Sequence, residues 1–352
     1  MNGIGIMSGS SLDGIDIALV SFDDNVPTSW QLVAYRTYSV PEEIAQALRS
    51  ITKLHAHEIA AIESQYSKFI ADCILSFSLV HQQAPDFISI HGHTVLHLPE
   101  QQTSWQLLNG GYIAAICNKT VICDFRSSDM ALGGQGTPMA VLADKDLFQG
   151  FDYYINLGGI ANISYKDGNN WLAFDLFPFN QVLNHFANQK NKKFDEDGGL
   201  AIQGKINDAV LSFLLEHDYI SKQHPKSLDN KELKELWIDP LNLFNIKPED
   251  VLRTYNEFTV IVFRTILAQG SSVFLSGGGA KNKYFISMLK GKASEKNIEI
   301  NIPNPEIVDY KEAILIAYAG YKRLKGEPNF IASATGATNN AIGGAVYLPP
   351  LK

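Results

Sequence analysis

The sequence predicts an α/β protein built from two similar domains. The chain has 352 residues, of which 45% are hydrophobic and 19% are charged, a composition typical of globular proteins. A single hydrophobic core stops growing near about 250 to 300 residues, so this length favours two domains. Two segments, 3–20 and 153–165, each read as a strand, a glycine-containing turn and a second strand. Because both halves begin alike, we expect an internally duplicated fold.

The first half combines strands with a few helices. Alternation of apolar with small or polar residues predicts strands, and apolar residues at helical spacing predict helices. We expect strands at 3–7, 15–20, 30–38, 87–91, 105–108 and 120–124, and helices at 42–53, 58–82 and 110–118. The glycine-dense passage from Gly133 to Pro138 follows, and it is the predicted crossing point between domains.

The second half is mostly helical after its opening strands. We expect strands at 153–157, 160–165, 171–174 and 272–275, helices at 181–188, 200–216, 230–237, 249–269, 283–290 and 310–324, and a strand-like segment at 345–348. The predicted domains are therefore 1–132 together with about 333–352, and 133–332.

Charge and hydropathy exclude several classes of protein. Asp and Glu number 37 against 29 Lys and Arg, for a formal charge of −8, and basic residues do not cluster with aromatic ones. Nucleic acids and anionic membrane surfaces are therefore not expected partners. The N-terminus lacks a basic region before its apolar residues, which argues against a signal peptide. The longest apolar stretch, 258–268, is interrupted by Arg264 and too short to span a bilayer. We expect a cytoplasmic protein.

Cysteine usage agrees with that expectation. The three cysteines form neither a CxxC pair nor a His/Cys zinc spacing, and they lie in apolar surroundings. We expect Cys73, Cys117 and Cys123 to be reduced thiols in the core.

Three glycine turns follow strands, at 9–14, 158–159 and 277–279. Glycine tolerates positive φ and leaves room for backbone N–H groups to converge on a phosphate. One such turn is more often an ordinary turn, but three of them favour a nucleotide held between domains. The sequence has no GxxxxGK[ST] motif, and its near match to GxGxxG lies inside a strand, so a P-loop or Rossmann enzyme is not expected.

Six segments together resemble one known family. They are GIMSGSSLDGIDIALV, HGHTV, DFRSSDMALGGQGTP, INLGGIANIS, FDEDGGLAIQGK and SGGGAKN, and they occur in the family's order along nearly the whole chain. On these segments the chain resembles the anhydro-N-acetylmuramic acid kinases, within the superfamily of actin, sugar kinases and heat-shock chaperones. The resemblance implies two ribonuclease-H-like domains that close over ATP and Mg²⁺, and it suggests a homodimer.

The resemblance also implies a reaction and its residues. Water opens the 1,6-anhydro ring of a muramic sugar while O6 receives the γ-phosphate of ATP, in peptidoglycan recycling. Asp175, at the end of strand 171–174, would be the base that activates the water. Asp13 and Asp16 would reach Mg²⁺ through water. The residues implied for ATP binding are Gly9, Ser10, Ser11, Asp13, Gly14, Asp16, Asn156, Gly158, Gly159, Gly277, Gly278, Gly279 and Asn282.

The residues implied for sugar binding are His91, Arg126 and Glu312. A planar guanidinium suits a carboxylate such as the lactyl group. Arg126 could instead form an ion pair with Asp129, and Glu312 could be an ordinary helix-surface residue. His91, with His93 and His97, resembles a metal cluster, but no carboxylate-and-histidine spacing accompanies these residues, so a zinc site is not expected.

The sequence departs from the family at substrate-side positions. Phe177 and Phe179 replace the two glycines of the usual Thr-Gly-Pro-Gly-Asn, and Asn184 replaces an acid. His93 replaces a glutamine, and 229–230 replaces Gly-Arg. Apolar bulk beside the proposed base would raise its pKa. These departures leave two alternatives open: a kinase of the same fold for a different sugar, or a non-catalytic ATP-binding regulatory module.

Overall fold

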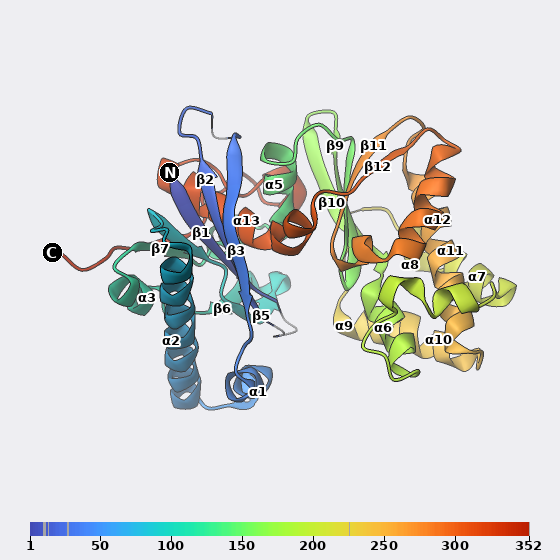
Figure 1. Cartoon of the computed structure of the whole chain (residues 1–352), viewed down its shortest axis with the longest axis horizontal. Coiled ribbons are helices and arrows are strands. Elements are labelled where there is room, and N and C mark those ends of the chain that lie inside the picture. Colours follow the sequence, from blue (N-terminus) through green and yellow to red (C-terminus); the bar gives the residue numbers. More distant parts are fainter. Residues whose placement is uncertain (10–11, 13, 27, 225, 352) are drawn as a thin grey trace. The chain divides into compact units, whose positions relative to one another are not determined.

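The computed structural model describes residues 1–9, 12, 14–26, 28–224 and 226–351 (Figure 1). The chain divides into two compact units. Unit 1 comprises Met1–Gln149 and Tyr310–Lys352, and unit 2 comprises Gly150–Asp309. Each unit has its own sheet and its own hydrophobic core.

Unit 1 is built on a six-stranded sheet with helices on both faces. Its elements are β1 (Asn2–Ser8), β2 (Ile15–Phe22), β3 (Trp30–Tyr38), α1 (Glu42–Ser50), α2 (Ala56–His81), β4 (Phe87–Ile90), β5 (His93–Leu98), β6 (Thr103–Leu107), α3 (Gly110–Cys117), β7 (Thr120–Cys123), α4 (Arg126–Ala131), α5 (Ala140–Asp146), α13 (Pro305–Lys325, from Tyr310), α14 (Ala332–Thr335) and β13 (Ala345–Tyr347). The strands β5 and β6 pair separately as a hairpin.

The sheet of unit 1 has the order β13-β7-β4-β1-β2-β3. β1, β2 and β3 are antiparallel neighbours, whereas β4 and β7 run parallel to β1. Alternate residues point to opposite faces. Ile4 and Ile6 join a core that includes residues of α2 and α3. On the other face, a side chain at Gly5 would collide with the carbonyl oxygen of Ala313, so glycine is needed for α13 to lie this close.

Unit 2 contains a second sheet and most of the remaining helices. Its elements are β8 (Tyr153–Leu157), β9 (Ile160–Asp167), β10 (Asn170–Pro178), α6 (Asn180–Asn188), α7 (Asp208–Leu215), α8 (Asp218–Ser221), α9 (Asn230–Leu233), α10 (Asp239–Leu243), α11 (Pro248–Ile266), β11 (Ser272–Ser276), α12 (Lys283–Ser294) and β12 (Glu299–Asn301). One large core joins residues of β8, β11, α6, α11 and α12.

The two sheets share one topology. The order β10-β9-β8-β11-β12 has the same pattern as β3-β2-β1-β4-β7: a three-stranded antiparallel meander, followed by two strands parallel to the first. This is the strand order of the ribonuclease-H fold. The internal duplication and the ribonuclease-H-like class expected from the sequence are therefore confirmed.

The boundaries between the units differ from those expected. The structure divides at 149/150 and 309/310, not at 132/133 and 332/333. The passage from Gly133 onward stays in unit 1 because Gly134 N–H donates to the Asp129 carbonyl at 2.9 Å and Gln135 N–H donates to the Thr335 carbonyl at 3.0 Å. The helix α13 belongs mainly to unit 1 because it covers one face of that unit's sheet.

The helix expected at 200–216 is interrupted. A 3₁₀ turn at Ala201–Gln203 is followed by α7. A side chain at Gly204 would lie 2.0 Å from the carbonyl oxygen of Glu249, so the chain passes directly against the start of α11 there. Asn207 then caps α7 by accepting a hydrogen bond from Val210 N–H at 3.0 Å.

The cysteines are free thiols; Cys73 and Cys123 are buried and Cys117 is half-buried. Among the helices described, none is long and apolar enough to cross a membrane.

Candidate active site

Asp175 is half-buried on β10 and held by the chain segment near residue 228. Its Oδ2 accepts a hydrogen bond from Leu228 N–H at 3.0 Å, and its own N–H donates to the Lys226 carbonyl at 3.1 Å. A β-bulge between Asp175 and Phe177 shifts the pairing with β9 at this point. Burial raises the pKa of the Asp175 carboxyl, and the Leu228 N–H lowers it. A carboxylate held in this way suits a general base.

The phenylalanines that replace the family's glycines belong to the apolar core. Phe177 is fully buried, with its ring 5.3 Å from that of Phe258 on α11. Phe179 is also fully buried, with its ring 5.2 Å from that of Phe285 on α12. The aromatic partners of both side chains come from the core helices, so the phenylalanines fill the apolar core of unit 2. The pKa of Asp175 is raised by burial, which is the direction expected from apolar bulk beside it.

The two glycine turns of unit 2 meet. Gly277, with φ of +84°, lies so close to the first turn that a side chain there would be 2.6 Å from Asn156 Oδ1 and 2.7 Å from the Leu157 carbonyl carbon. The carbonyl of Gly159 accepts hydrogen bonds from the N–H groups of Phe179 and Gln181. No hydrogen bond to another described residue is donated by the N–H groups of Gly158 and Gly159. Such main-chain donors suit an anion.

Gly278 and Gly279 begin a 3₁₀ turn that leads to Asn282. A side chain at Gly279 would lie 2.4 Å from the ring of Phe179, whereas one at Gly278 would come no closer than 3.6 Å to the Asn180 side chain. Asn282 caps α12 by accepting a hydrogen bond from Phe285 N–H at 3.1 Å. The structure therefore gives Asn282 a structural role, beside the adenosine contact that the sequence analysis expects.

The first glycine turn of unit 1 is described only in part. Ser10, Ser11 and Asp13 lie outside the described residues. Asp16, on β2, accepts a hydrogen bond from the Thr37 hydroxyl at 2.6 Å. Gly14 packs against Thr37, whose methyl group would be 2.7 Å from a side chain at that glycine.

His91, Arg126, Glu312 and Asp16 influence one another's charge in unit 1. Burial and the positive charge of Arg126 lower the pKa of His91 to about 3, so this histidine is neutral. Burial lowers the pKa of Arg126 to about 10, and Glu312 opposes that change. Glu312 is open to solvent, but the protein atoms crowded around it and the charge of Asp16 raise its pKa. Arg126 thus acts on the pKa values of both His91 and Glu312, and Asp16 acts on that of Glu312.

Asp129 is engaged elsewhere and does not serve as the ionic partner considered for Arg126. The Asp129 side chain is fully buried; Oδ1 accepts from the Thr335 hydroxyl at 2.7 Å and Oδ2 accepts from Gly136 N–H at 2.8 Å. The Nε of Arg126 and the Nε2 of His91 are buried without a hydrogen-bond partner in the described part of the chain. Buried polar atoms of this kind call for a ligand or water.

The described residues contain no group of three or more His, Cys, Asp or Glu side chains arranged to bind a metal ion. His93 and His97, which follow β4, contact an aromatic ring and a hydroxyl. His93 is buried, with its ring 6.4 Å from that of Tyr66, and the Nδ1 of His97 lies 3.2 Å from the Ser104 hydroxyl.

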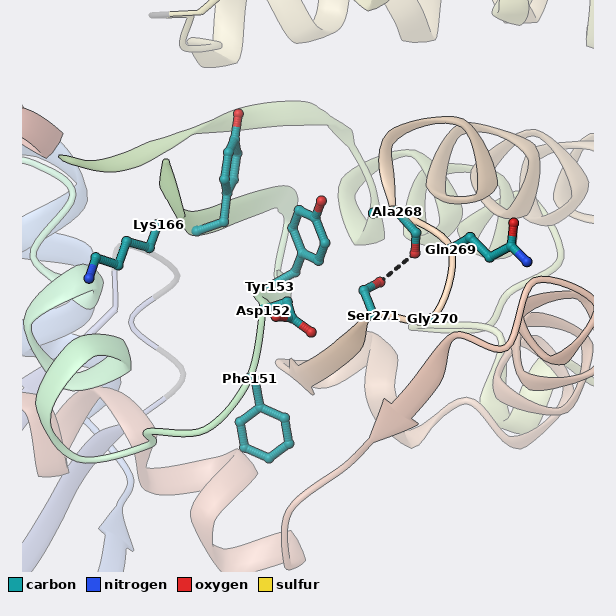
Figure 2. Close-up of a pocket in the computed structure, with 9 residues that line it drawn as sticks. Phe151, Asp152, Tyr153, Lys166, Ala268, Gln269, Gly270 and Ser271 are labelled. Carbon is teal, nitrogen blue, oxygen red and sulfur yellow. Dashed lines mark hydrogen bonds between the residues drawn. The ribbon is translucent and has the colours of Figure 1, made fainter. Parts of the chain in front are cut away.

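Two cavities in unit 2 lie apart from these residues. The larger, of about 560 Å³, is lined by 151–153, 165–166 and 268–271, and Figure 2 shows Ser271 donating to the Ala268 carbonyl at its wall. The smaller, of about 370 Å³, is lined by residues between Lys192 and Gln203. In that segment the Asp195 carboxylate accepts hydrogen bonds from the N–H groups of Leu200 and Ala201 and so stabilises a turn.

Sequence reasoning missed the residues that hold Asp175. Tyr219 donates its hydroxyl to the Asp175 carbonyl at 3.2 Å, and Lys226 and Leu228 contribute through their main chain. Lys226 and Leu228 bond Asp175 through main-chain atoms, which no residue type specifies, so the sequence carries no signal for these two contacts.

The fold and these residues define a class: a protein of two ribonuclease-H-like units, with glycine turns and a held carboxylate that suit phosphoryl transfer. Comparison with known proteins gives the family. The family model described as anhydro-N-acetylmuramic acid kinase matches residues 1–349. Curated relatives of that name include those of Hydrogenovibrio crunogenus, 31% identical over 98% of both chains, and Sulfurovum sp., 33% identical over 98% of both chains. A third, from Rhodopseudomonas palustris, is 31% identical over 99% of this chain and all of its own. This chain belongs to the anhydro-N-acetylmuramic acid kinase family.

Proposed function

We propose that this protein uses ATP to convert 1,6-anhydro-N-acetylmuramic acid into N-acetylmuramic acid 6-phosphate. Family membership supports the substrate, and the arrangement around Asp175 supports the chemistry. We place the reaction in the cytoplasm, in peptidoglycan recycling, with the protein acting as a homodimer.

The observation that carries the proposal is the carboxylate of Asp175. Leu228 N–H fixes Oδ2 at 3.0 Å, which leaves Oδ1 to accept a proton from water. As the water oxygen bonds to the anomeric carbon, the C1–O6 bond breaks and its electron pair goes to O6. O6 then bonds to the γ-phosphorus, the bond from that phosphorus to its bridging oxygen breaks, and ADP leaves. A raised pKa matches this base to work nearer neutral pH.

The glycine turns of unit 2 fit the phosphates of a nucleotide. Their close approach leaves no room for side chains at Gly277 and Gly279, and main-chain N–H groups at Gly158 and Gly159 are available. Backbone donors that are already in place need no reorganisation as charge develops during phosphoryl transfer.

Mg²⁺ fits the carboxylates of unit 1. Asp16 and Glu312 are close enough for the charge of one to raise the pKa of the other, and a hydrated divalent cation prefers oxygen ligands of this kind. Bound there, the ion would neutralise charge on the phosphates. Asp16 would hold it, with Asp13 as the second carboxylate that the sequence implies.

Arg126 and His91 fit the sugar. The Arg126 guanidinium stays charged at a pKa of about 10 and has a buried Nε without a partner in the described chain. It would bind the lactyl carboxylate. The neutral His91, whose Nδ1 lies 2.9 Å from the Gly92 carbonyl, would direct Nε2 to a sugar hydroxyl as an acceptor. Glu312 would contact the sugar beside them.

The test is to measure ATP consumption and phosphosugar formation by the purified protein with Mg²⁺ and 1,6-anhydro-N-acetylmuramic acid. Sugar-dependent turnover that disappears in Asp175→Asn supports the proposal. ATP binding without sugar-dependent turnover would contradict it and would favour a kinase for a different sugar or a regulatory module.

A further inference from the structure

The main chain at Asp175 is held from outside its own sheet. Asp175 N–H donates to the Lys226 carbonyl at 3.1 Å, so the bulge in β10 is completed by this segment instead of by β9. The Asp175 carbonyl accepts from the Tyr219 hydroxyl at 3.2 Å. With the Leu228 N–H on Oδ2, both main-chain polar groups of Asp175 and one carboxylate oxygen have partners in residues 219–228.

The Lys226 side chain contacts Tyr219 and Phe174. Its Nζ donates to the Tyr219 carbonyl at 2.9 Å and lies 4.7 Å from the centre of the Tyr219 ring. It also lies 5.8 Å from the ring of Phe174, the residue before Asp175. A half-buried ammonium between two aromatic rings is an effective anchor, since cation–π attraction strengthens when water is partly excluded. Lys226 is therefore held against Tyr219 and against Phe174, the neighbour of Asp175.

We infer that Tyr219, Lys226 and Leu228 are positioning residues that fix the main chain of Asp175 and select Oδ1 as the oxygen that acts as the base. The inference rests on the proposed function for the role of Asp175 as a base, but the geometry that it describes does not. Leu228 bonds Oδ2 in the charged form, so Oδ1 keeps its lone pairs for the water.

Burial raises the pKa of the Asp175 carboxyl, and the Leu228 N–H is the group that lowers it. The titratable groups nearby act mainly on one another. Tyr219 has its pKa raised by burial and by the charge of Asp175, so it stays a neutral donor. Burial lowers the pKa of Lys226, with Lys222 adding to the effect. His224 stacks on Phe174 with ring centres 5.3 Å apart, and Glu232 acts on Tyr219. The pKa of the Asp175 carboxyl itself is raised by burial and lowered by the Leu228 N–H.

The decisive experiment compares Leu228→Pro, which lacks the N–H, with Leu228→Ala, which keeps it. The pKa of the Asp175 carboxyl is measured by ¹³C NMR of protein labelled at aspartate Cγ, with Asp175→Asn assigning the signal. A hydrogen bond to a charged group contributes about 1.5 kcal/mol, so its loss should raise this pKa by about one unit. The acid limb of the kcat profile should move to higher pH by the same amount in Leu228→Pro only.

A second pair of variants leaves the backbone donor in place. In Tyr219→Phe and Lys226→Met, kcat should fall by about fivefold to tenfold at unchanged KM, since a small displacement of a base slows catalysis strongly, while the acid limb stays where it is. If Leu228→Pro has no cooperative melting transition and is therefore unfolded, Tyr219→Phe and Lys226→Met test the positioning role in its place.

Equal Asp175 pKa values in Leu228→Pro and Leu228→Ala, or unchanged kcat in both Tyr219→Phe and Lys226→Met, would overturn the inference. The NMR readout needs no substrate. A wild-type protein that fails to phosphorylate the sugar but shows the pKa shift would therefore contradict the proposed function and leave the positioning role of Leu228 supported.

Discussion

The two units share a strand order but hold their polar groups by different means. In unit 2, Asp175 and the glycine turns depend on main-chain N–H and carbonyl groups placed by the fold. In unit 1, Arg126, Glu312 and His91 depend on one another's charges. A duplicated fold thus carries two kinds of polar surface: one set by backbone geometry and one by the balance of charge.

This difference predicts how each unit responds to substitution. Changes in unit 2 should act through geometry and show little dependence on salt. Changes in unit 1 should act through charge, and their effects should vary with pH and with the charge that remains.

The largest effect should come from Asp175→Asn. The amide keeps the shape and accepts the Leu228 hydrogen bond through its oxygen, but it cannot take a proton from water, so kcat should fall by about 10³-fold. The measurement is sugar-dependent ADP release under saturating substrate. Asp239→Asn, at an exposed carboxylate of the same unit that pairs with Lys234, is the control and should stay within about twofold of wild type. Comparable losses in both variants would contradict the assignment.

Gly277→Ala should be the most damaging change to the backbone of the unit 2 turns. The new methyl group would meet Asn156 and Leu157 at a φ of +84°, which should lower the free energy of unfolding by about 3 kcal/mol. Gly278→Ala is the matched control because its new methyl group would lie 3.6 Å from the Asn180 amide nitrogen, and it should change stability by less than about 1 kcal/mol. Urea unfolding checks both. Equal destabilisation would show that the close approach of the turns is not the cause.

Arg126→Lys tests the charge-based surface of unit 1. The charge is retained but the planar fork is lost, so the sugar should bind about 30-fold more weakly, which corresponds to about 2 kcal/mol. Titration calorimetry with the sugar, at low and high salt, measures this. Arg36→Lys, at an exposed arginine whose guanidinium lies over the ring of Tyr38, should bind the sugar as wild type does. Unchanged affinity in Arg126→Lys would remove this arginine from the sugar site.

The smallest effect concerns pH and His91. Its pKa is about 3 in the folded protein and about 6.5 when unfolded, so the unfolded chain binds more protons between these values. The stability that this residue contributes is present above about pH 6.5 and is lost at about 1.4 kcal/mol per pH unit as the pH falls toward 3. Unfolding midpoints at pH 7.5 and 5.5 should therefore differ less in His91→Asn than in wild type. Parallel pH dependence would contradict the assignment.

Most of the fold could be predicted because its signals are local. The hairpins at residues 3–20 and 153–165 follow from alternation and from glycine at the turns, and both occur as expected. The interruption at Gly204 could not be predicted, since its cause is the backbone of Glu249 on another element. The hairpin of β5 and β6 was only partly expected, because a histidine-rich segment carries no clear strand signal.

In the candidate site, too, local signals could be predicted from the sequence and contacts between distant segments could not. Asp175 could be proposed from its place at a strand end and from the family's motif. The groups that hold it could not, because Tyr219 and Leu228 are 44 and 53 residues away, and two of the three partner atoms, the Lys226 carbonyl oxygen and the Leu228 nitrogen, belong to the main chain. A contact made by main-chain atoms does not require a particular residue type, so it gives no signal in the sequence. The departures from the family at 229–230 are thus compatible with an intact hold on the base.

Unit 1 is made of two separate stretches of chain, whereas unit 2 is one continuous stretch between them. During synthesis, unit 2 is therefore complete in sequence before α13 and β13 have been translated. Until then the sheet of unit 1 lacks the helix that packs against Gly5 and the strand that pairs with β7. Since domains generally fold as units while the chain grows, unit 2 should complete its fold before unit 1 does.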